Sequence, residues 1–214
     1  MDRIIKYGLL LGTIFLLCTS CSAEQSMKEE ISETKEGALS KGEKILIIYL
    51  SRTKNTKAVA EIIHSTVGGD LVALEVANPY PEHYQTMVDQ VAAENSQGYL
   101  PPLKTKIDSM DKYDIIFIGF PTWGMQLPPP MKSFLNEYNL TGKTVIPFNT
   151  NAGYGVGSSF ETVIQRCPNS KVLEGYSTQG VKERDGILFV MEGDTEKTVK
   201  GEIQNWLKKI GFNF

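Results

Sequence analysis

The sequence contains little cysteine and histidine, the side chains that hold most transition-metal sites, with three cysteines and two histidines among 214 residues. His64 and His83 lie in or beside separate predicted helices without a cysteine or carboxylate at ligand spacing, so no metal site is expected. The chain also lacks an excess of charge of one sign. Removing the 5 basic and 6 acidic residues of 1–42 from the totals of 22 and 25 leaves 17 and 19. With this balance nothing in the sequence suggests the basic surface of a nucleic-acid-binding protein, and no nucleic acid is expected as a partner.

Long apolar runs are absent except at the N-terminus, which has the pattern of an export signal. Arg3 and Lys6 precede the apolar residues 8–17, and small residues follow. The run is too short for a transmembrane helix. Residues 1–20 are therefore predicted to be a lipoprotein signal peptide that is removed from the mature protein.

Cys21 is the predicted lipidation site, because it follows Thr19 and Ser20 in a pattern that resembles the bacterial lipobox. Cleavage by the ordinary signal peptidase is the alternative, since Cys18 stands where the lipobox prefers leucine. Acylation of Cys21 would leave Cys167 as the only thiol, with no disulfide framework or CxxC metal site available. Cys167 lies on the apolar face of a predicted helix and is expected in the core.

Residues 21–42 are rich in serine, glutamate and lysine and contain few apolar side chains. They cannot bury enough surface to fold and are predicted to be a disordered tether. Residues 43–214 have the size of one domain. The expected protein is exported and anchored by lipid in a bacterial cell envelope, where a redox partner protein or a membrane electron donor would serve it.

The domain alternates predicted strands with predicted helices. Short apolar, β-branched runs occur at 44–50, 70–76, 113–120, 144–149 and 171–175. Apolar residues at helical spacing follow each run, beginning near Val59, Tyr84, Met131, Phe160 and Val199. This pattern predicts an α/β fold of three layers, with helices on both faces of a five-stranded parallel sheet. Its ligand crevice would lie outside the carboxyl ends of the strands.

A hydroxyl-rich turn joins the first strand to the first helix. Ser51, Thr53 and Thr56 can donate hydrogen bonds there, Asn55 suits the turn, and the start of the helix has free N–H groups. The turn lacks the GxxxxGK[ST] pattern and the glycines of a dinucleotide fold, so it predicts a phosphate site without favouring NTP or pyrophosphate. A capped helix start that binds nothing is the alternative.

Two later loops carry exposed aromatic residues at the same edge of the predicted sheet. Trp123 lies in a loop between Gly119 and three prolines, and Tyr154 lies in the glycine-rich loop 149–157. Aromatic side chains at loop tips favour binding of a flat ligand. A phosphate turn with two aromatics predicts a mononucleotide with a planar ring system, and FMN fits this description.

The domain resembles the flavodoxin family from Lys44 to the C-terminus, in three motifs in the family's order. The resemblance implies a sheet of order 2-1-3-4-5 and non-covalent FMN, with Trp123 and Tyr154 flanking the ring and a peptide that turns at Gly124. The implied cofactor-binding residues are Ser51, Arg52, Thr53, Lys54, Asn55 and Thr56 in the turn, Pro121, Thr122, Trp123, Gly124 and Met125 in the first loop, and Asn151, Ala152, Gly153, Tyr154 and Gly155 in the second.

Two positions depart from the family pattern. Lys54 replaces the glycine of the phosphate turn, so either a positive φ is not needed there or strain is tolerated, and its ammonium could instead pair with the phosphate. Met125 stands where electron-transfer members often carry acidic residues. Without that repulsion, the reduced flavin should have a higher potential than in strongly acidic flavodoxins.

The predicted function is electron transfer by FMN that cycles between oxidised, semiquinone and hydroquinone states, with no catalytic side chain. An FMN-dependent NAD(P)H:quinone-type oxidoreductase on the same fold is the alternative, because fold does not decide function. A phospho-acceptor receiver domain is excluded, since the ends of the first and third strands read Tyr49-Leu50-Ser51 and Gly119-Phe120-Pro121 without the required acidic residues.

Overall fold

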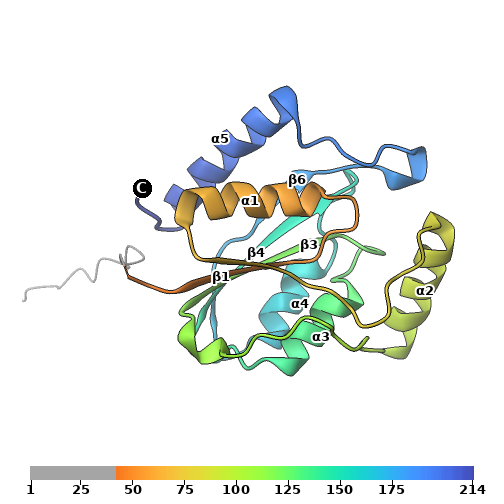
Figure 1. Cartoon of the computed structure of the whole chain (residues 1–214), viewed down its shortest axis with the longest axis horizontal. Coiled ribbons are helices and arrows are strands. Elements are labelled where there is room, and N and C mark those ends of the chain that lie inside the picture. The colour runs from red at the N-terminus through yellow and green to blue at the C-terminus, as the bar shows by residue number, and fades with distance from the viewer. Residues whose placement is uncertain (1–41) are drawn as a thin grey trace, which may run out of the picture. The chain divides into compact units, whose positions relative to one another are not determined.

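The computed structural model describes residues 42–214 of the chain. The predicted signal peptide, the lipidation of Cys21 and nearly all of the tether lie outside the described residues. From residue 42 onward, strands and helices alternate along the chain (Figure 1), as the sequence predicts for an α/β fold. No helix in this part of the protein is long and apolar enough to cross a bilayer.

The sheet has the predicted strand order, β2-β1-β3-β4-β5, with all neighbouring strands parallel. The strands are β1 (Ile45–Tyr49), β2 (Asp70–Ala73), β3 (Ile115–Pro121), β4 (Thr144–Asn151), β5 (Lys171–Val172) and β6 (Tyr176–Gln179). The helices are α1 (Asn55–Val67), α2 (Tyr84–Gln97), α3 (Pro129–Glu137), α4 (Ser159–Arg166) and α5 (Gly193–Lys209), with 3-10 turns η1 (Met110–Lys112) and η2 (Glu183–Asp185).

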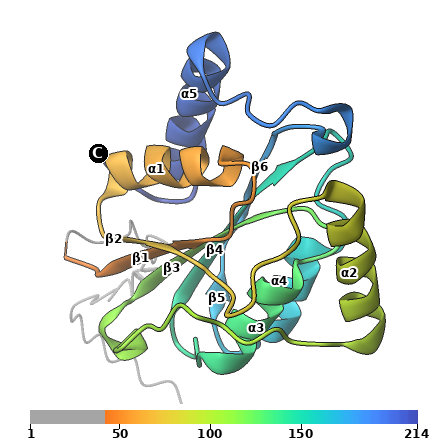
Figure 2. The ribbon, with the colours of Figure 1, turned by 45° about the vertical axis from the view of Figure 1, so that its right-hand side comes forward.

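The sheet lies between two layers of helices, with α1 and α5 on one face and α3 and α4 on the other (Figure 2). Side chains alternate along β3, so that Phe117 packs toward α1 and α5 while Ile116 and Ile118 pack toward α3 and α4. All three are fully buried, which explains why the strand is apolar at every position. Phe117 also meets Trp206 of α5 edge-on, with ring centroids 6.1 Å apart.

The last strand position is divided into β5 and β6, where the sequence predicts one strand over residues 171–175. β5 pairs with the first two residues of β4 and β6 with its last four. The carbonyl of Val145 accepts from Leu173 N at 2.9 Å, so the backbone of Val145 faces the β5–β6 side of β4. Every second residue of a strand has its backbone N–H and C=O on the same side, and the backbone of Pro147 therefore faces this side too. Proline has no N–H to donate, and the ladder is interrupted there.

α2 stands apart from the layer of helices that covers the sheet. The chain leaves the sheet after β2 and returns before β3, and Ala77 N donates to Pro102 O at 2.8 Å across the base of this excursion. α2 packs on α3 and lies beside the carboxyl ends of the strands (Figure 1). Helices on both faces are confirmed, but α2 is placed at the edge where the ligand crevice is expected.

Candidate functional site

The turn between β1 and α1 leaves backbone N–H groups free at the start of the helix. Lys54 adopts the left-handed conformation, with φ 68° and ψ −7°, so strain is tolerated at the position where the resemblance places glycine. The N–H groups of Asn55 and Thr56 have no acceptor among residues 42–214, while Lys57 N donates to Ser51 Oγ at 3.2 Å. Free N–H groups at the positive end of a helix form a site for an anion.

Three threonine hydroxyls lie beside this turn. Thr56 Oγ1 is 2.8 Å from Thr150 Oγ1 at the end of β4, and both threonines are buried. One hydroxyl of the pair donates to the other, so one proton remains available to a ligand. Thr53 Oγ1 accepts from Asn55 Nδ2 at 2.9 Å and keeps its own proton available. The sequence identifies Thr53 and Thr56 as candidate phosphate ligands but not Thr150, which it places only within the glycine-rich loop 149–157.

The side chain of Asn55 is satisfied by the protein. Its Nδ2 donates to the carbonyl of Leu188 at 2.9 Å, and its Oδ1 accepts from Val190 N at 3.1 Å. The amide thereby mimics a strand neighbour and holds the segment before α5 against the turn. Asn55 therefore offers a ligand its backbone N–H rather than its side chain.

Arg52 is also used to join segments. Its Nε donates to Glu183 Oε1 at 2.7 Å, and its two terminal nitrogens donate to Pro81 O at 2.8 Å and Glu82 O at 2.5 Å. One guanidinium thus connects the phosphate turn, the residues before α2 and η2. Planar arginine forks suit such multiple contacts, which fix the cavity wall instead of leaving the charge free.

The loop after β3 closes in a turn whose two central residues are both left-handed. Trp123 N donates to Gln126 O at 3.3 Å, and Gln126 N donates to Trp123 O at 3.1 Å. Gly124 has φ 58° and Met125 has φ 59°, which is the pattern of a type I′ turn. Glycine suits such a position, whereas Met125 holds a side chain at positive φ. The turn sets Trp123 at its first corner.

Contacts on two sides fix this turn. The carbonyl of Met125 accepts from Ser158 N at 3.0 Å, and a β-carbon on Gly157 would lie 2.0 Å from the same oxygen. Tyr80 meets the indole of Trp123 edge-on, with ring centroids 5.2 Å apart at 75°. Trp123 is therefore held between the loop before α4 and the residues before α2.

The loop after β4 folds around the side chain of Asn151. Its Oδ1 accepts from Gly153 N at 2.9 Å and from Gly155 N at 3.1 Å. The carbonyl of Gly155 accepts from Thr122 Oγ1 at 3.1 Å, which ties this loop to the loop after β3. Tyr154, between the two glycines, is 61% exposed and available for stacking.

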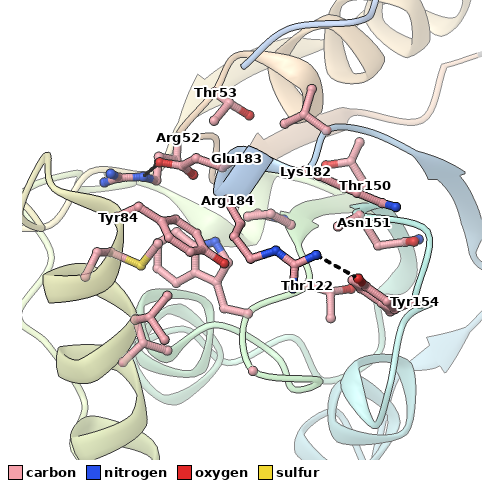
Figure 3. Close-up of a pocket in the computed structure, with 18 of the residues that line it drawn as sticks. Arg52, Thr53, Tyr84, Thr122, Thr150, Asn151, Tyr154, Lys182, Glu183 and Arg184 are labelled. Carbon is pink, nitrogen blue, oxygen red and sulfur yellow. Dashed lines mark hydrogen bonds and ion pairs between the residues drawn. The ribbon is translucent and has the colours of Figure 1, made fainter. Parts of the chain in front are cut away.

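These segments line one cavity of about 470 Å³ (Figure 3), within the roughly 300–1,000 Å³ of ligand sites. Of the residues expected at the cofactor, those that line the cavity are Arg52, Thr53, Asn55, Thr56, Pro121, Thr122, Trp123, Gly124, Asn151, Ala152 and Tyr154. Those outside the lining are Ser51, Lys54, Met125, Gly153 and Gly155. Lys54 is exposed, and the other four shape the turns behind the cavity.

Two further segments complete the lining. The first is Val181 to Arg184, which leads into η2. The second is one face of α2, which sequence reasoning missed, and its lining residues are Tyr84, Met87, Val88, Val91, Ala92, Asn95 and Ser96. The spacing of these residues predicts a helix but does not distinguish a face on the core from a face on a cavity.

The charged side chains that line the cavity are mainly positive. Its one acidic residue, Glu183, is paired with Arg52. Lys182 Nζ lies 5.8 Å from the centroid of the Tyr154 ring, and Arg184 Nη2 donates to the Tyr154 hydroxyl at 3.4 Å. Figure 3 shows Arg184 reaching across the cavity toward Tyr154. Such a site favours an anionic ligand.

A family model described as Flavodoxin matches residues 44–192 of this sequence, which is most of the chain. The chain belongs to the flavodoxin family. A flavodoxin of Nostoc sp. is 25% identical over 150 residues, covering 68% of this chain and 74% of that protein. A solved structure from Bacteroides eggerthii is 28% identical with a TM-score of 0.64, covering 80% of this chain and 99% of that one. A Lactobacillus acidophilus flavoprotein in complex with FMN shares the fold, at 24% identity and TM-score 0.57, covering 64% of this chain and 93% of that one.

Flavodoxins bind FMN, and the residues of this flavodoxin-family cavity fit that cofactor. The donor set at the start of α1 is made of N–H and O–H groups with no carboxylate among them, as a phosphate requires. Trp123 and Tyr154 line the same cavity and offer aromatic faces to a planar ring. Among residues 42–214, no three histidine, cysteine or acidic side chains gather as a metal site.

Proposed function

We propose that this chain binds one FMN without a covalent bond and acts in electron transfer. The observation that carries the proposal is that the free N–H groups of Asn55 and Thr56 adjoin the cavity that Trp123 and Tyr154 line. Bound FMN supplies the redox chemistry, since the flavin has oxidised, one-electron-reduced and two-electron-reduced states.

The protein's part is to bind and orient the cofactor. The start of α1 holds the phosphate with the two N–H groups and with the free protons of Thr53 and the Thr56–Thr150 pair. Trp123 and Tyr154 hold the ring between them. No side chain is needed as an acid or base. The comparisons with flavodoxins and flavoproteins do not favour the NAD(P)H:quinone-type alternative.

Titration of the protein with FMN tests this assignment of the site. Tyr154→Ala should weaken FMN binding by about tenfold, because a stacked aromatic ring contributes on the order of 1–1.5 kcal/mol. Tyr99→Ala is the matched control, since Tyr99 is 49% exposed but does not line the cavity. Equal affinity in both variants would place the ring elsewhere.

We also propose that the mature protein is anchored by lipid at Cys21 in a bacterial cell envelope and exchanges electrons with a redox partner protein or membrane donor. The pattern of residues 1–21 supports this. Mass spectrometry of the mature N-terminal peptide should find acyl chains on Cys21 and lose them in Cys21→Ser. An unmodified N-terminus at another residue would support cleavage by the ordinary signal peptidase instead.

A further inference from the structure

One face of α2 lines the cavity but belongs to neither the phosphate turn nor the two aromatic loops. Tyr84, Val88 and Ala92 follow one another at four-residue spacing along this face. None of the three is charged, and their side chains are half-buried or exposed. The cavity therefore has an apolar wall with an aromatic ring at one end.

Asn95 ends this face with a hydrogen-bond donor. Lys132 Nζ donates to Asn95 Oδ1 at 2.8 Å and to Gln126 Oε1 at 3.2 Å. This contact orients the amide, so Nδ2 is turned away from the ammonium and has no acceptor among residues 42–214. A β-carbon built on Gly124 would lie 3.9 Å from Asn95 Nδ2, so the donor stands beside the turn that carries Trp123.

The wall is held firmly in its place. Tyr80, which packs on Trp123, donates its hydroxyl to Glu94 Oε2 at 2.5 Å, and Gln90 Nε2 donates to Glu94 Oε1 at 2.8 Å. Glu94 is itself buried. Arg52 adds its contact with the carbonyl of Pro81. These bonds fix the separation between the wall and the aromatic loop.

We propose that this face of α2 is a subsite for a second small molecule, flat and mainly apolar, with a carbonyl oxygen at its edge, as in a quinone. The inference rests on the proposed function, in which FMN fills the rest of the cavity. Val88 and Ala92 supply apolar contact, Tyr84 supplies an aromatic face, and Asn95 Nδ2 donates to the carbonyl. The subsite requires only that this second molecule binds beside the flavin, and it does not depend on which donor reduces the flavin.

Isothermal titration calorimetry of the FMN-loaded full chain with menadione tests the subsite. Ala92→Phe fills the wall and should weaken menadione binding by at least about tenfold. Ala93→Phe is the matched control, because Ala93 is also exposed but does not line the cavity, and it should leave binding within about twofold. The affinity of both variants for FMN should stay within about threefold.

Asn95→Asp tests the donor separately from the wall. The variant keeps an oxygen for Lys132 but replaces Nδ2 with an acceptor, so menadione should bind about tenfold more weakly. The comparison probe is 2-methylnaphthalene, which has the same flat shape without carbonyls. It should bind the variant and the unsubstituted chain equally.

Three results would overturn the inference. Failure of menadione to bind the FMN-loaded chain would leave the proposed function intact and remove the subsite. Loss of FMN affinity in Ala92→Phe, but not in Ala93→Phe, would assign the wall to the flavin itself. A chain that takes up no FMN would contradict the proposed function and this inference together.

Discussion

Arg52 and Glu183 form an ion pair at 2.7 Å, with side chains only 18% and 15% exposed, although 131 residues separate them in sequence. The pair joins the phosphate turn to the segment that carries Lys182 and Arg184 over the cavity. Because the same guanidinium also holds the carbonyls of Pro81 and Glu82, one side chain sets the distance between three walls of the site.

Glu183→Gln should therefore loosen the cavity. We expect the free energy of unfolding to fall by about 1 kcal/mol and the affinity for FMN to fall a few-fold, since a sheltered, hydrogen-bonded ion pair is lost. Glu174→Gln is the control, because its pair with Lys209 is 58–64% exposed and should contribute less than about 0.5 kcal/mol. Urea unfolding and FMN titration measure both quantities, and equal behaviour of the two variants would refute the role of the pair.

Gly157 should tolerate no side chain. A β-carbon there would lie 2.0 Å from the carbonyl oxygen of Met125, at a φ of 56°. Gly157→Ala is expected to lower the free energy of unfolding by more than about 2 kcal/mol. At Gly155 the φ is 85°, but no atom lies within 4 Å of a β-carbon built there. Gly155→Ala should therefore lower the free energy of unfolding only by the conformational cost of about 1–2 kcal/mol. If the two variants unfold at the same urea concentration, a β-carbon at position 157 does not meet the carbonyl oxygen of Met125.

Lys54 should be replaceable by glycine with a gain in stability. Its φ of 68° costs a residue with a side chain about 1 kcal/mol, so Lys54→Gly should raise the free energy of unfolding and Lys54→Val should lower it. Because Lys54 is exposed and outside the cavity lining, FMN affinity should change by less than about threefold. A large loss of affinity in Lys54→Gly would show that the ammonium does pair with the phosphate.

The fold could be predicted from sequence because its central strands β1 and β3 are buried on both faces and almost entirely apolar. The break between β5 and β6 could not, since it depends on which neighbour Pro147 faces. The same limit applies to the site. Trp123 and Tyr154 are conspicuous at loop tips, whereas Thr150 and Asn95 acquire their roles only when distant elements meet across the cavity.

Cys167 should resist modification in the folded protein. Burial raises the pKa of its thiol to about 11, so the reactive thiolate is scarce at neutral pH. The unfolded thiol titrates near pH 8.5, so this group's contribution to stability is complete below that pH and is lost as the pH rises toward 11. Iodoacetamide at pH 8 should label the Cys167 peptide only in urea. A shallower alkaline loss of stability is expected in Cys167→Ala, and rapid labelling of the native protein would contradict its burial.

The positive side chains beside Tyr154 should raise the midpoint potential of the bound flavin. Lys182 and Arg184 favour the anionic reduced form, and each charge contributes on the order of 1 kcal/mol, or about 20 mV for a two-electron couple. Lys182→Gln combined with Arg184→Gln should lower the potential by about twice that amount. The double variant Lys197→Gln with Lys200→Gln, on exposed positions of α5 outside the cavity lining, is the control. Spectroelectrochemical titration that finds no difference would place the ring away from these cations.

The most direct measurement is the FMN content of the purified protein. We expect a yellow protein that carries one FMN per chain, releases it on heating, and takes it up again at micromolar concentration. A colourless protein that fails to bind added FMN at that concentration would contradict the assignment of the cavity.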